Sequence, residues 1–180
     1  VIKDSGPGMT EEEQERYDAY NKYYGNRDYL FDLNSIPTGS SGFGYDIPAD
    51  ALSDPQFAKM IREAEKYLGV PYVWGGYSPS GFDCSGFVSW VINNCGNGWN
   101  IGRCTADGLR SHCSQVSPSE AKPGDLIFFQ GTYNTAGASH VGIVVDPVNK
   151  IMIHCGNPIQ YASYDTPYWR AHAYCYGRIQ

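Results

Sequence analysis

The sequence predicts an α+β domain, on two observations. Apolar residues recur at helical spacing in the first half of the chain, and four short β-type runs separated by turn residues follow. Helices first and strands afterwards are typical of an α+β fold, whereas a doubly wound fold alternates the two. The 180 residues, of which 42% are hydrophobic, suffice for one domain with a modest extension.

A first helix is predicted over residues 11–24. Thr10 opens a capping-box pattern, and acidic residues fill the first turn. Three tyrosines recur along one side of this helix, namely Tyr17, Tyr20 and Tyr24. They either dock the helix on the main domain or form part of a surface for a substrate or partner.

A linker and a second helix are expected next. Residues 36–50 are rich in Gly, Ser and Pro, which is typical of linkers. Ser53-Asp54-Pro55 then begins a helix that Gly69 ends, with an apolar face of Phe57, Ile61, Ala64 and Leu68. We therefore expect a helical extension and linker over 1–50 and a compact catalytic domain over 51–180.

The stretch "GFDCSGFVSW" begins a third helix, over 84–95. Its apolar residues continue from Cys84 at spacings of three and four, as Phe87, Val88, Val91 and Cys95. A short helix is expected over 105–113. Four strands are then predicted in "KPGDLIFFQG" (122–131), "SHVGIVVD" (139–146), "KIMIHCG" (150–156) and "AHAYCYGRI" (171–179).

Composition excludes some classes of function. A net charge of -6 and a pI near 5.1, with no run of Lys or Arg, argue against nucleic-acid partners. No apolar stretch approaches the roughly 20 residues that cross a bilayer, so no transmembrane segment is expected. The chain begins without a signal peptide and is expected to be part of a longer protein. The 14% aromatic content suits either a groove for sugars or peptides or a tyrosine-rich core rim.

Six cysteines are present, without a C-x-x-C pair that would indicate structural zinc. If Cys84 is a free thiol, the other five permit at most two disulfides. The candidate pairings are among Cys95, Cys104 and Cys113, or of Cys155 with Cys175.

Cys84 and two histidines form the candidate catalytic group. A thiol needs help to ionise at neutral pH, and here a helix N-terminus and a histidine would supply it. The strands 140–145 and 150–154 are joined by a turn at 146–149, so residue numbers that sum to 294 or 295 should pair. His140 and His154 then face each other, one as base and one to orient it. His112 and His172 are expected to be structural or surface residues.

These residues leave other interpretations open. A cysteine at a helix start is commonly buried filler, and a strand histidine is commonly a satisfied polar residue. Zinc could use Cys84, His140, His154 and Cys155, but Cys155 follows His154 directly in a strand and should point to the opposite face. No metal and no cofactor are therefore expected.

Five motifs in order carry a resemblance to a known family: "LGVPYVWGG", "GFDCSGFVSW", "KPGDLIFF", "SHVGIVVD" and "MIHCGN". Together they resemble the NlpC/p-sixty cysteine endopeptidases of bacterial cell walls, over about residues 53–180. The resemblance implies a papain-like α+β fold, in which the nucleophile helix packs on a central antiparallel sheet. Two departures are Cys155, where a small residue such as Ala is common, and the segment 95–113, which matches no pattern of the family.

The resemblance also implies roles at the site. Cys84 would be the nucleophile, His140 the general base and His154 the residue that orients it. Tyr72 would help to stabilise the oxyanion.

Four further residues are implied as substrate-binding. Asp83 and Ser85 would bind the free amine of an N-terminal L-Ala, although Asp83 could instead only cap the helix. Trp74 and Ser139, in the matched motifs, would line the same groove.

The activity implied is hydrolysis of peptidoglycan stem peptides between γ-D-Glu and the L-diamino acid, in an extracellular or cell-wall protein. The same scaffold serves N-acetylmuramoyl-L-alanine amidases and acyl transferases, and a non-catalytic cell-wall-binding module is the alternative from another class.

Overall fold

The computed structural model describes residues 42–180. Its helices are α2 (Ala49–Leu52), α3 (Pro55–Glu65), α4 (Cys84–Asn94), α5 (Ala106–Ser111) and α6 (Pro167–Ala171), with a 3-10 turn, η3 (Pro118–Glu120). Its strands are β1 (Tyr77–Ser78), β2 (Gly81–Phe82), β3 (Cys113–Val116), β4 (Leu126–Gln130), β5 (Ala138–Asp146), β6 (Ile151–Cys155), β7 (Ile159–Ser163) and β8 (Ala173–Ile179). The helix predicted over 11–24 lies outside the described residues.

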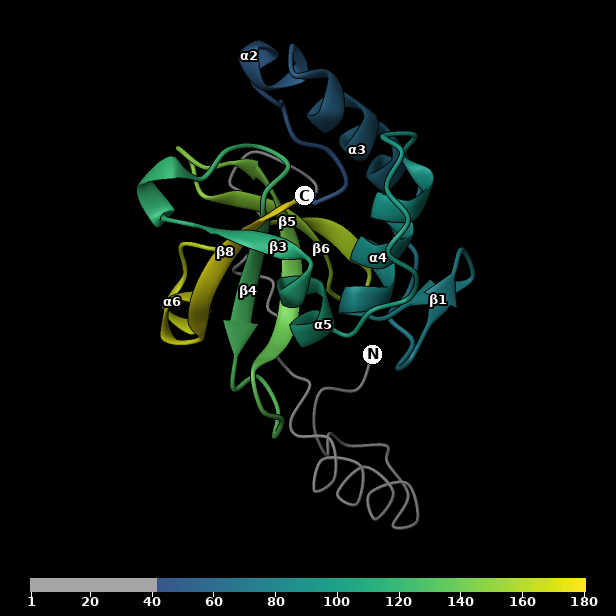
Figure 1. Ribbon diagram of the computed structural model, residues 1–180, viewed down its shortest axis with the longest axis vertical. Coiled ribbons are helices and arrows are strands. Elements are labelled where there is room, and N and C mark those ends of the chain that lie inside the picture. The colour runs from purple at the N-terminus through teal and green to yellow at the C-terminus, as the bar shows by residue number, and fades with distance from the viewer. Residues whose placement is uncertain (1–41) are drawn as a thin grey trace, which may run out of the picture.

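An antiparallel sheet of six strands forms the centre of the domain, in the order β3-β8-β4-β5-β6-β7. The strands from β4 to β7 form a meander, and β8 returns to the free side of β4. Helices α3, α4 and α5 lie beside the sheet, as Figure 1 shows. This arrangement confirms the predicted α+β architecture, with the expected helices at α3, α4 and α5 and the expected strands at β4, β5, β6 and β8.

Local sequence explains where the helices begin. Asp54 caps α3 by accepting the Gln56 N–H, and Pro55 occupies the first helical position. The predicted apolar face of this helix is buried, except that α3 ends at Glu65, so Leu68 packs on the core from the turn that follows. Gly69, with φ of 87°, turns the chain out of that segment.

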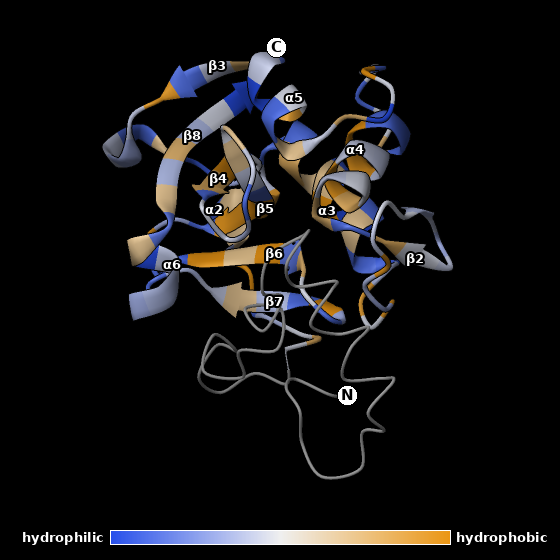
Figure 2. Cartoon of the chain, turned by 90° about the horizontal axis from the view of Figure 1, so that it is seen from below, coloured by the Kyte–Doolittle hydropathy of each residue, from blue (hydrophilic) through white to orange (hydrophobic). Residues whose placement is uncertain are grey.

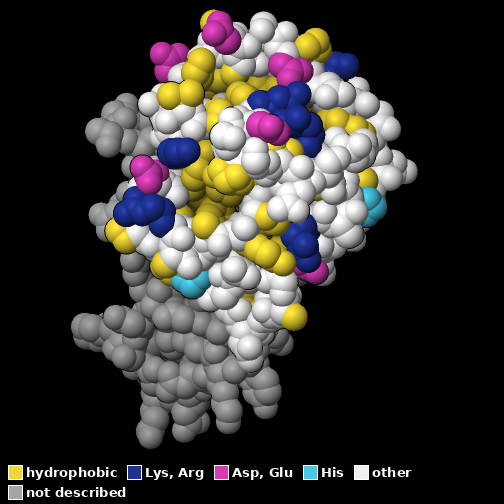
Figure 3. All heavy atoms as spheres, turned by 60° about the vertical axis from the view of Figure 1, so that its left-hand side comes forward, with side chains coloured by type: hydrophobic (Ala, Val, Ile, Leu, Met, Phe, Trp, Pro, Cys, Tyr) yellow, Lys and Arg dark blue, Asp and Glu magenta, His cyan; other side chains and the backbone are white. Residues whose placement is uncertain are grey.

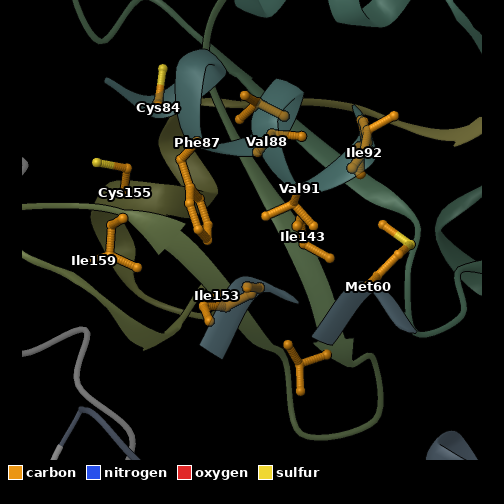
Figure 4. Close-up of a cluster of buried hydrophobic side chains, with 14 of the residues drawn as sticks. Met60, Cys84, Phe87, Val88, Val91, Ile92, Ile143, Ile153, Cys155 and Ile159 are labelled. Atoms are coloured by element: carbon orange, nitrogen blue, oxygen red, sulfur yellow. The ribbon is translucent and has the colours of Figure 1, made fainter. Parts of the chain in front are cut away.

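The main core lies between α4 and the sheet. Helix α4 is buried on more than its predicted face, because Ser85, Gly86 and Ser89 are buried along with its apolar residues. The close-up in Figure 4 shows Phe87 and Val91 of α4 directed toward Ile143 and Ile153 of the sheet. Figure 2 shows the same apolar interior along α4, β5 and β6.

A smaller apolar cluster contains strand residues that alternate with those of the main core and therefore point to the other face of the sheet. Ile127, Phe129, Val144 and Met152 pack there with Trp169 of α6. Beside it, side chains of β3, β4 and β8 line an apolar groove of about 320 Å³. Figure 3, which brings the α6 and β8 side forward, shows hydrophobic side chains gathered between Lys and Arg side chains. No helix within residues 42–180 is both long and apolar enough to cross a membrane.

The register predicted for the β5–β6 hairpin is wrong. His154 pairs with Gly142, not with His140, and Asp146 pairs with Ile151 across a bulge. The turn also extends to Lys150, which adopts a left-handed φ of 61°. The shift in pairing is two residues, which equals the side-chain period of a strand, so His140 and His154 still lie on the same face.

The predicted disulfides do not form. All six cysteines, which lie within residues 42–180, are free thiols. Cys155 and Cys175 are on β6 and β8, which β4 and β5 separate, so they lie about 14 Å apart, beyond the reach of a disulfide. The thiols of Cys95 and Cys104 instead contact the carbonyls of Ile92 and Ile101 at 3.5 and 3.4 Å.

The described part of the predicted linker lies against the domain. The Tyr45 hydroxyl donates to Asp146 at 2.9 Å, and the Tyr161 N–H donates to the Gly42 carbonyl at 2.7 Å. Tyr45 and Ile47 also pack on the main core. Residues 42–48 therefore follow the surface of the domain closely.

Among the glycines compared in residues 42–180, the one with least room for a side chain is Gly86, at the start of α4. A Cβ placed on Gly86 would lie 2.0 Å from the Gly76 carbonyl oxygen, and backbone atoms cannot yield as a side chain would. We expect Gly86→Ala to lower the free energy of unfolding by about 2 kcal/mol or more, although Ala favours helix. Urea unfolding measures this difference. Gly44→Ala, with no atom within 4 Å of the new Cβ, is the matched control, and an equal effect of both substitutions contradicts the packing described.

Candidate active site

Cys84 is the first residue of α4, and the local sequence fixes its position. The Asp83 carboxylate caps the helix by accepting the Gly86 N–H at 2.7 Å, as one interpretation of the sequence expected. The thiol lies over β5, where its Sγ is 4.0 Å from the Ser139 carbonyl oxygen and the Val141 N–H also points to it. Ser139 and Val141 flank His140, so the helix start brings the thiol to the strand position of that histidine.

The two predicted histidines are in direct contact. The His140 Nε2 and His154 Nδ1 atoms are 2.9 Å apart, and the two rings are nearly perpendicular at 82°. Gly142 lies between them in the strand register, and a Cβ there would meet His154 Cβ at 3.2 Å and Met152 Sδ at 2.9 Å. A glycine at this position therefore lets the His154 ring approach His140 diagonally.

Trp169 encloses the histidine pair. Its ring stacks on His140 at a centroid distance of 5.2 Å and meets His154 edge-on at 5.6 Å. Helix α6 positions it, since Thr166 caps this helix by accepting the Trp169 N–H and Pro167 takes the first turn. All three rings are almost fully buried, and this packing restricts the orientation of both imidazoles.

Burial determines the protonation of the site. Desolvation, followed by the negative charge of Asp83, raises the pKa of Cys84 to about 12, although the N–H groups of Val141 and Ser85 and the charge of Arg103 oppose this. Burial and the neighbouring His154 hold the pKa of His140 well below 6.5, and burial lowers the pKa of His154 to about 3. The helix N-terminus was expected to help the thiol ionise, but burial outweighs it, so the neutral thiol and neutral imidazoles are favoured.

A groove of about 320 Å³ opens above the thiol. It contains the predicted residues of the site other than the histidines, namely Tyr72, Trp74, Asp83, Cys84, Ser85 and Ser139. At one wall Trp74 and Tyr133 meet edge to face at 5.3 Å. The groove thus brings together residues from three separate motifs.

The predicted groove residues differ in how they are held. The Tyr72 N–H donates to Asn157 at 3.0 Å, which ties the segment before β1 to the end of β6. The Ser139 hydroxyl lies 2.7 Å from the Thr132 hydroxyl and is buried, so its carbonyl is the group nearest the thiol. Asp83 and Ser85 both bond to Arg103, at 2.7 and 2.9 Å.

Sequence reasoning missed Trp169 and Arg103. The Thr166-Pro167 pair is a helix-start signal that could have revealed α6. Arg103 lies in the segment 95–113 that matched no family pattern, and nothing in its local sequence indicated a contact with Asp83.

The described part of the chain contains no cluster of side chains suited to bind a metal ion. Within residues 42–180, no group of three or more His, Cys, Asp or Glu side chains is arranged to hold a metal ion. Cys155, which was weighed as a zinc ligand, donates its thiol to the Phe82 carbonyl at 3.2 Å in the main core, away from the ring of His154.

A helix-borne thiol above a strand that carries a buried, partnered histidine, in an α+β domain with an antiparallel sheet, defines the papain-like class of domain. The model of the NlpC/P60 family matches residues 69–178. The chain belongs to the NlpC/P60 family.

Curated relatives cover most of the described domain. The bifunctional muramidase/DL-endopeptidase CwlT of Bacillus subtilis is 40% identical over 126 residues, which are 69% of this chain and 37% of CwlT. A gamma-DL-glutamyl hydrolase of the same organism is 38% identical over 122 residues, 66% of this chain and 29% of the relative. The chain therefore matches only about a third of the length of these relatives.

Solved structures show the same fold. An NLP/P60 family protein from Staphylococcus aureus gives a TM-score of 0.65 at 34% identity, covering 79% of this chain and 44% of that one. The NlpC/p60 domain of the peptidoglycan hydrolase SagA gives 0.56 at 36% identity, covering 68% of this chain and 98% of that domain.

The neutral resting thiol gives a pH prediction. Only the thiolate reacts with iodoacetamide, and with a pKa of about 12 the thiolate fraction of Cys84 rises about tenfold per pH unit below that value. We expect the rate of alkylation at Cys84, followed by peptide mass mapping, to rise steadily from pH 6 to pH 9. A rate that is already constant above pH 6 would show a thiolate–imidazolium pair and contradict this account.

Proposed function

We propose that this domain is a cysteine endopeptidase that hydrolyses peptidoglycan stem peptides between γ-D-Glu and the L-diamino acid. The observation that carries the proposal is the Cys84 thiol in the groove, beside the strand residue His140, whose ring contacts His154. The names of two relatives support the choice of bond, since one is a DL-endopeptidase and the other a gamma-DL-glutamyl hydrolase.

The groove suits a short peptide. Its volume of about 320 Å³ is at the lower end of ligand sites, and its walls combine aromatic and polar side chains. In this proposal Trp74 and the Ser139 backbone border the peptide, and Asp83 and Ser85 shape one end of the groove. The net charge of -6 argues against a nucleic-acid substrate.

The first chemical step is acylation of the thiol. Because the thiol is neutral at rest, its proton passes to His140 Nδ1 as Sγ bonds to the γ-carbonyl carbon, and the carbonyl oxygen becomes an oxyanion. The Tyr72 hydroxyl, at the groove, donates to this oxyanion. Collapse breaks the C–N bond, the amine of the diamino acid takes the proton from His140, and a thioester remains.

The second step is hydrolysis of the thioester. His140 Nδ1 takes a proton from water as the water oxygen attacks the thioester carbon. The C–S bond then breaks, His140 returns that proton to the departing thiolate, and the γ-carboxylic acid product is released. Both steps require His140 Nδ1 to be unprotonated at first, so the ring proton of His140 is on Nε2. This Nε2–H donates a hydrogen bond to His154 Nδ1. His154 thereby fixes the tautomer and the orientation of the base, the role of the third group in such sites.

The reaction uses the thiol, the imidazoles and water, and the proposal includes no cofactor. We place the activity at the bacterial cell wall or outside the cell, where the substrate is, and in a longer protein of which this domain is one part. The supporting observation is that the region shared with this chain makes up only 37% and 29% of the two relatives.

Replacing the nucleophile tests the proposal. Cys84→Ala is expected to reduce muropeptide cleavage by about 10³-fold or more with the fold intact, because no other group in the groove can form the thioester. Products are read by mass spectrometry and the fold by circular dichroism. Cys95→Ala, at the far end of α4, is the matched control and should retain activity.

Other outcomes would reject the proposal. Release of the whole stem peptide from the sugar would assign an amidase, and transfer of the acyl group to an amine would assign an acyl transferase. Binding without cleavage by the unaltered protein would assign a wall-binding module.

A further inference from the structure

Arg103 lies beside the nucleophile in the groove. Its Nη2 donates to Asp83 Oδ2 at 2.7 Å, and its Nη1 donates to the Ser85 hydroxyl at 2.9 Å and to the Cys104 carbonyl at 2.6 Å. The ring of Tyr77 lies 5.9 Å from the guanidinium carbon. The guanidinium is thus fixed on several sides by groups of the protein.

The Asp83 carboxylate has no capacity left for a substrate amine. Its Oδ1 accepts the Gly86 N–H at 2.7 Å and the Ser85 hydroxyl at 3.2 Å. Its Oδ2 accepts the Gly75 N–H at 3.1 Å as well as Arg103. A carboxylate offers about four acceptor sites, so all are used. An ammonium group could bind only by displacing Arg103, which already supplies the positive charge.

One edge of the guanidinium is unused. The bonds to Asp83, Ser85 and Cys104 use both Nη1 protons and one Nη2 proton, while Nε–H and the second Nη2–H have no acceptor among residues 42–180. These two parallel donors form the fork that binds a carboxylate through both of its oxygens. The side chain is 31% exposed and lines the groove together with Cys84.

The other charged residue of the groove does not offer a competing site. Asp107 accepts the Ala138 N–H at 3.0 Å and the Arg110 Nε–H at 2.9 Å, both through Oδ1. As an acid it repels a carboxylate, so it does not compete with Arg103 for one. Among the groove residues of the described chain, Arg103 alone is a cation.

We propose that Arg103 determines specificity by binding a carboxylate of the acyl part of the substrate, with Asp83 and Ser85 as the residues that hold its guanidinium. This inference rests on the proposed function and refines its substrate class. A D-Glu linked through its γ-carboxyl keeps a free α-carboxylate close to the scissile carbonyl, whereas a carboxamide at that position is neutral. The domain then selects the carboxylate form and does not require a free N-terminal amine.

Two matched peptide pairs test this with the unaltered protein. One pair of L-Ala-γ-D-Glu-L-Lys peptides differs only in the α-carboxylate or α-carboxamide of D-Glu, and the other only in a free or acetylated N-terminus. We expect kcat/KM to fall at least about tenfold for the carboxamide and less than about threefold for the acetylated peptide, since the carboxamide loses the charged, two-oxygen contact with the guanidinium. A large loss on acetylation with none on amidation would overturn the inference and return the amine-binding role to Asp83.

Substitutions of Arg103 test whether this residue causes the preference for the carboxylate peptide. Arg103→Gln should abolish the discrimination between carboxylate and carboxamide, and Arg103→Lys, which keeps the charge without the fork, should reduce it. Arg170→Gln, which alters an arginine equally paired with an aspartate but on the exposed surface of α6, should leave it unchanged. Full discrimination in Arg103→Gln rejects the inference. Equal cleavage of both peptides by the unaltered protein rejects it while the proposed function stands, and cleavage of no peptide rejects the proposed function.

Discussion

One carboxylate, that of Asp83, joins the parts of the chain that meet at the active site. It caps α4, holds the Gly75 N–H of the segment before β1, and binds Arg103 of the segment before α5. The close contact of Gly86 with the Gly76 carbonyl depends on the same alignment. The position of the Cys84 thiol therefore follows from how three separate segments bond to Asp83.

A second constraint, in the strands, determines how the two histidines lie. Because Gly142 has no side chain, His154 reaches diagonally to His140, and Trp169 closes over both rings. This enclosure orients the His140 ring but also removes water from it, which favours neutral imidazoles and a neutral thiol. In the proposed mechanism the geometry is prepared before reaction, and charge separation develops only as the thiol attacks. The cost of burying ions at rest is avoided.

Periodicity and caps were sufficient to predict α3, α4, α5 and the strands β4, β5 and β6, because each buries apolar residues of its own. Strand β8, in which only Gly177 is buried, was predicted from its β-type residues. The edge strands β3 and β7 are short and partly polar, and they were missed. The His140–His154 contact was predicted through a wrong register, since a bulge and the left-handed Lys150 are not visible in a pattern. The contacts of Arg103 and Trp169, and the raised pKa of Cys84, arise from packing between distant segments, which local sequence does not encode.

In the proposed reaction Cys84 carries the acyl group during turnover. An L-Ala-D-Glu dipeptide with its γ-carboxyl as a p-nitrophenyl ester tests it directly, because the activated leaving group makes acylation faster than hydrolysis of the thioester. Mass spectrometry after an acid quench should show one acyl group per chain, on the peptide that contains Cys84. Turnover of the ester with Cys84 unmodified, or an acyl group on another residue, would contradict the account.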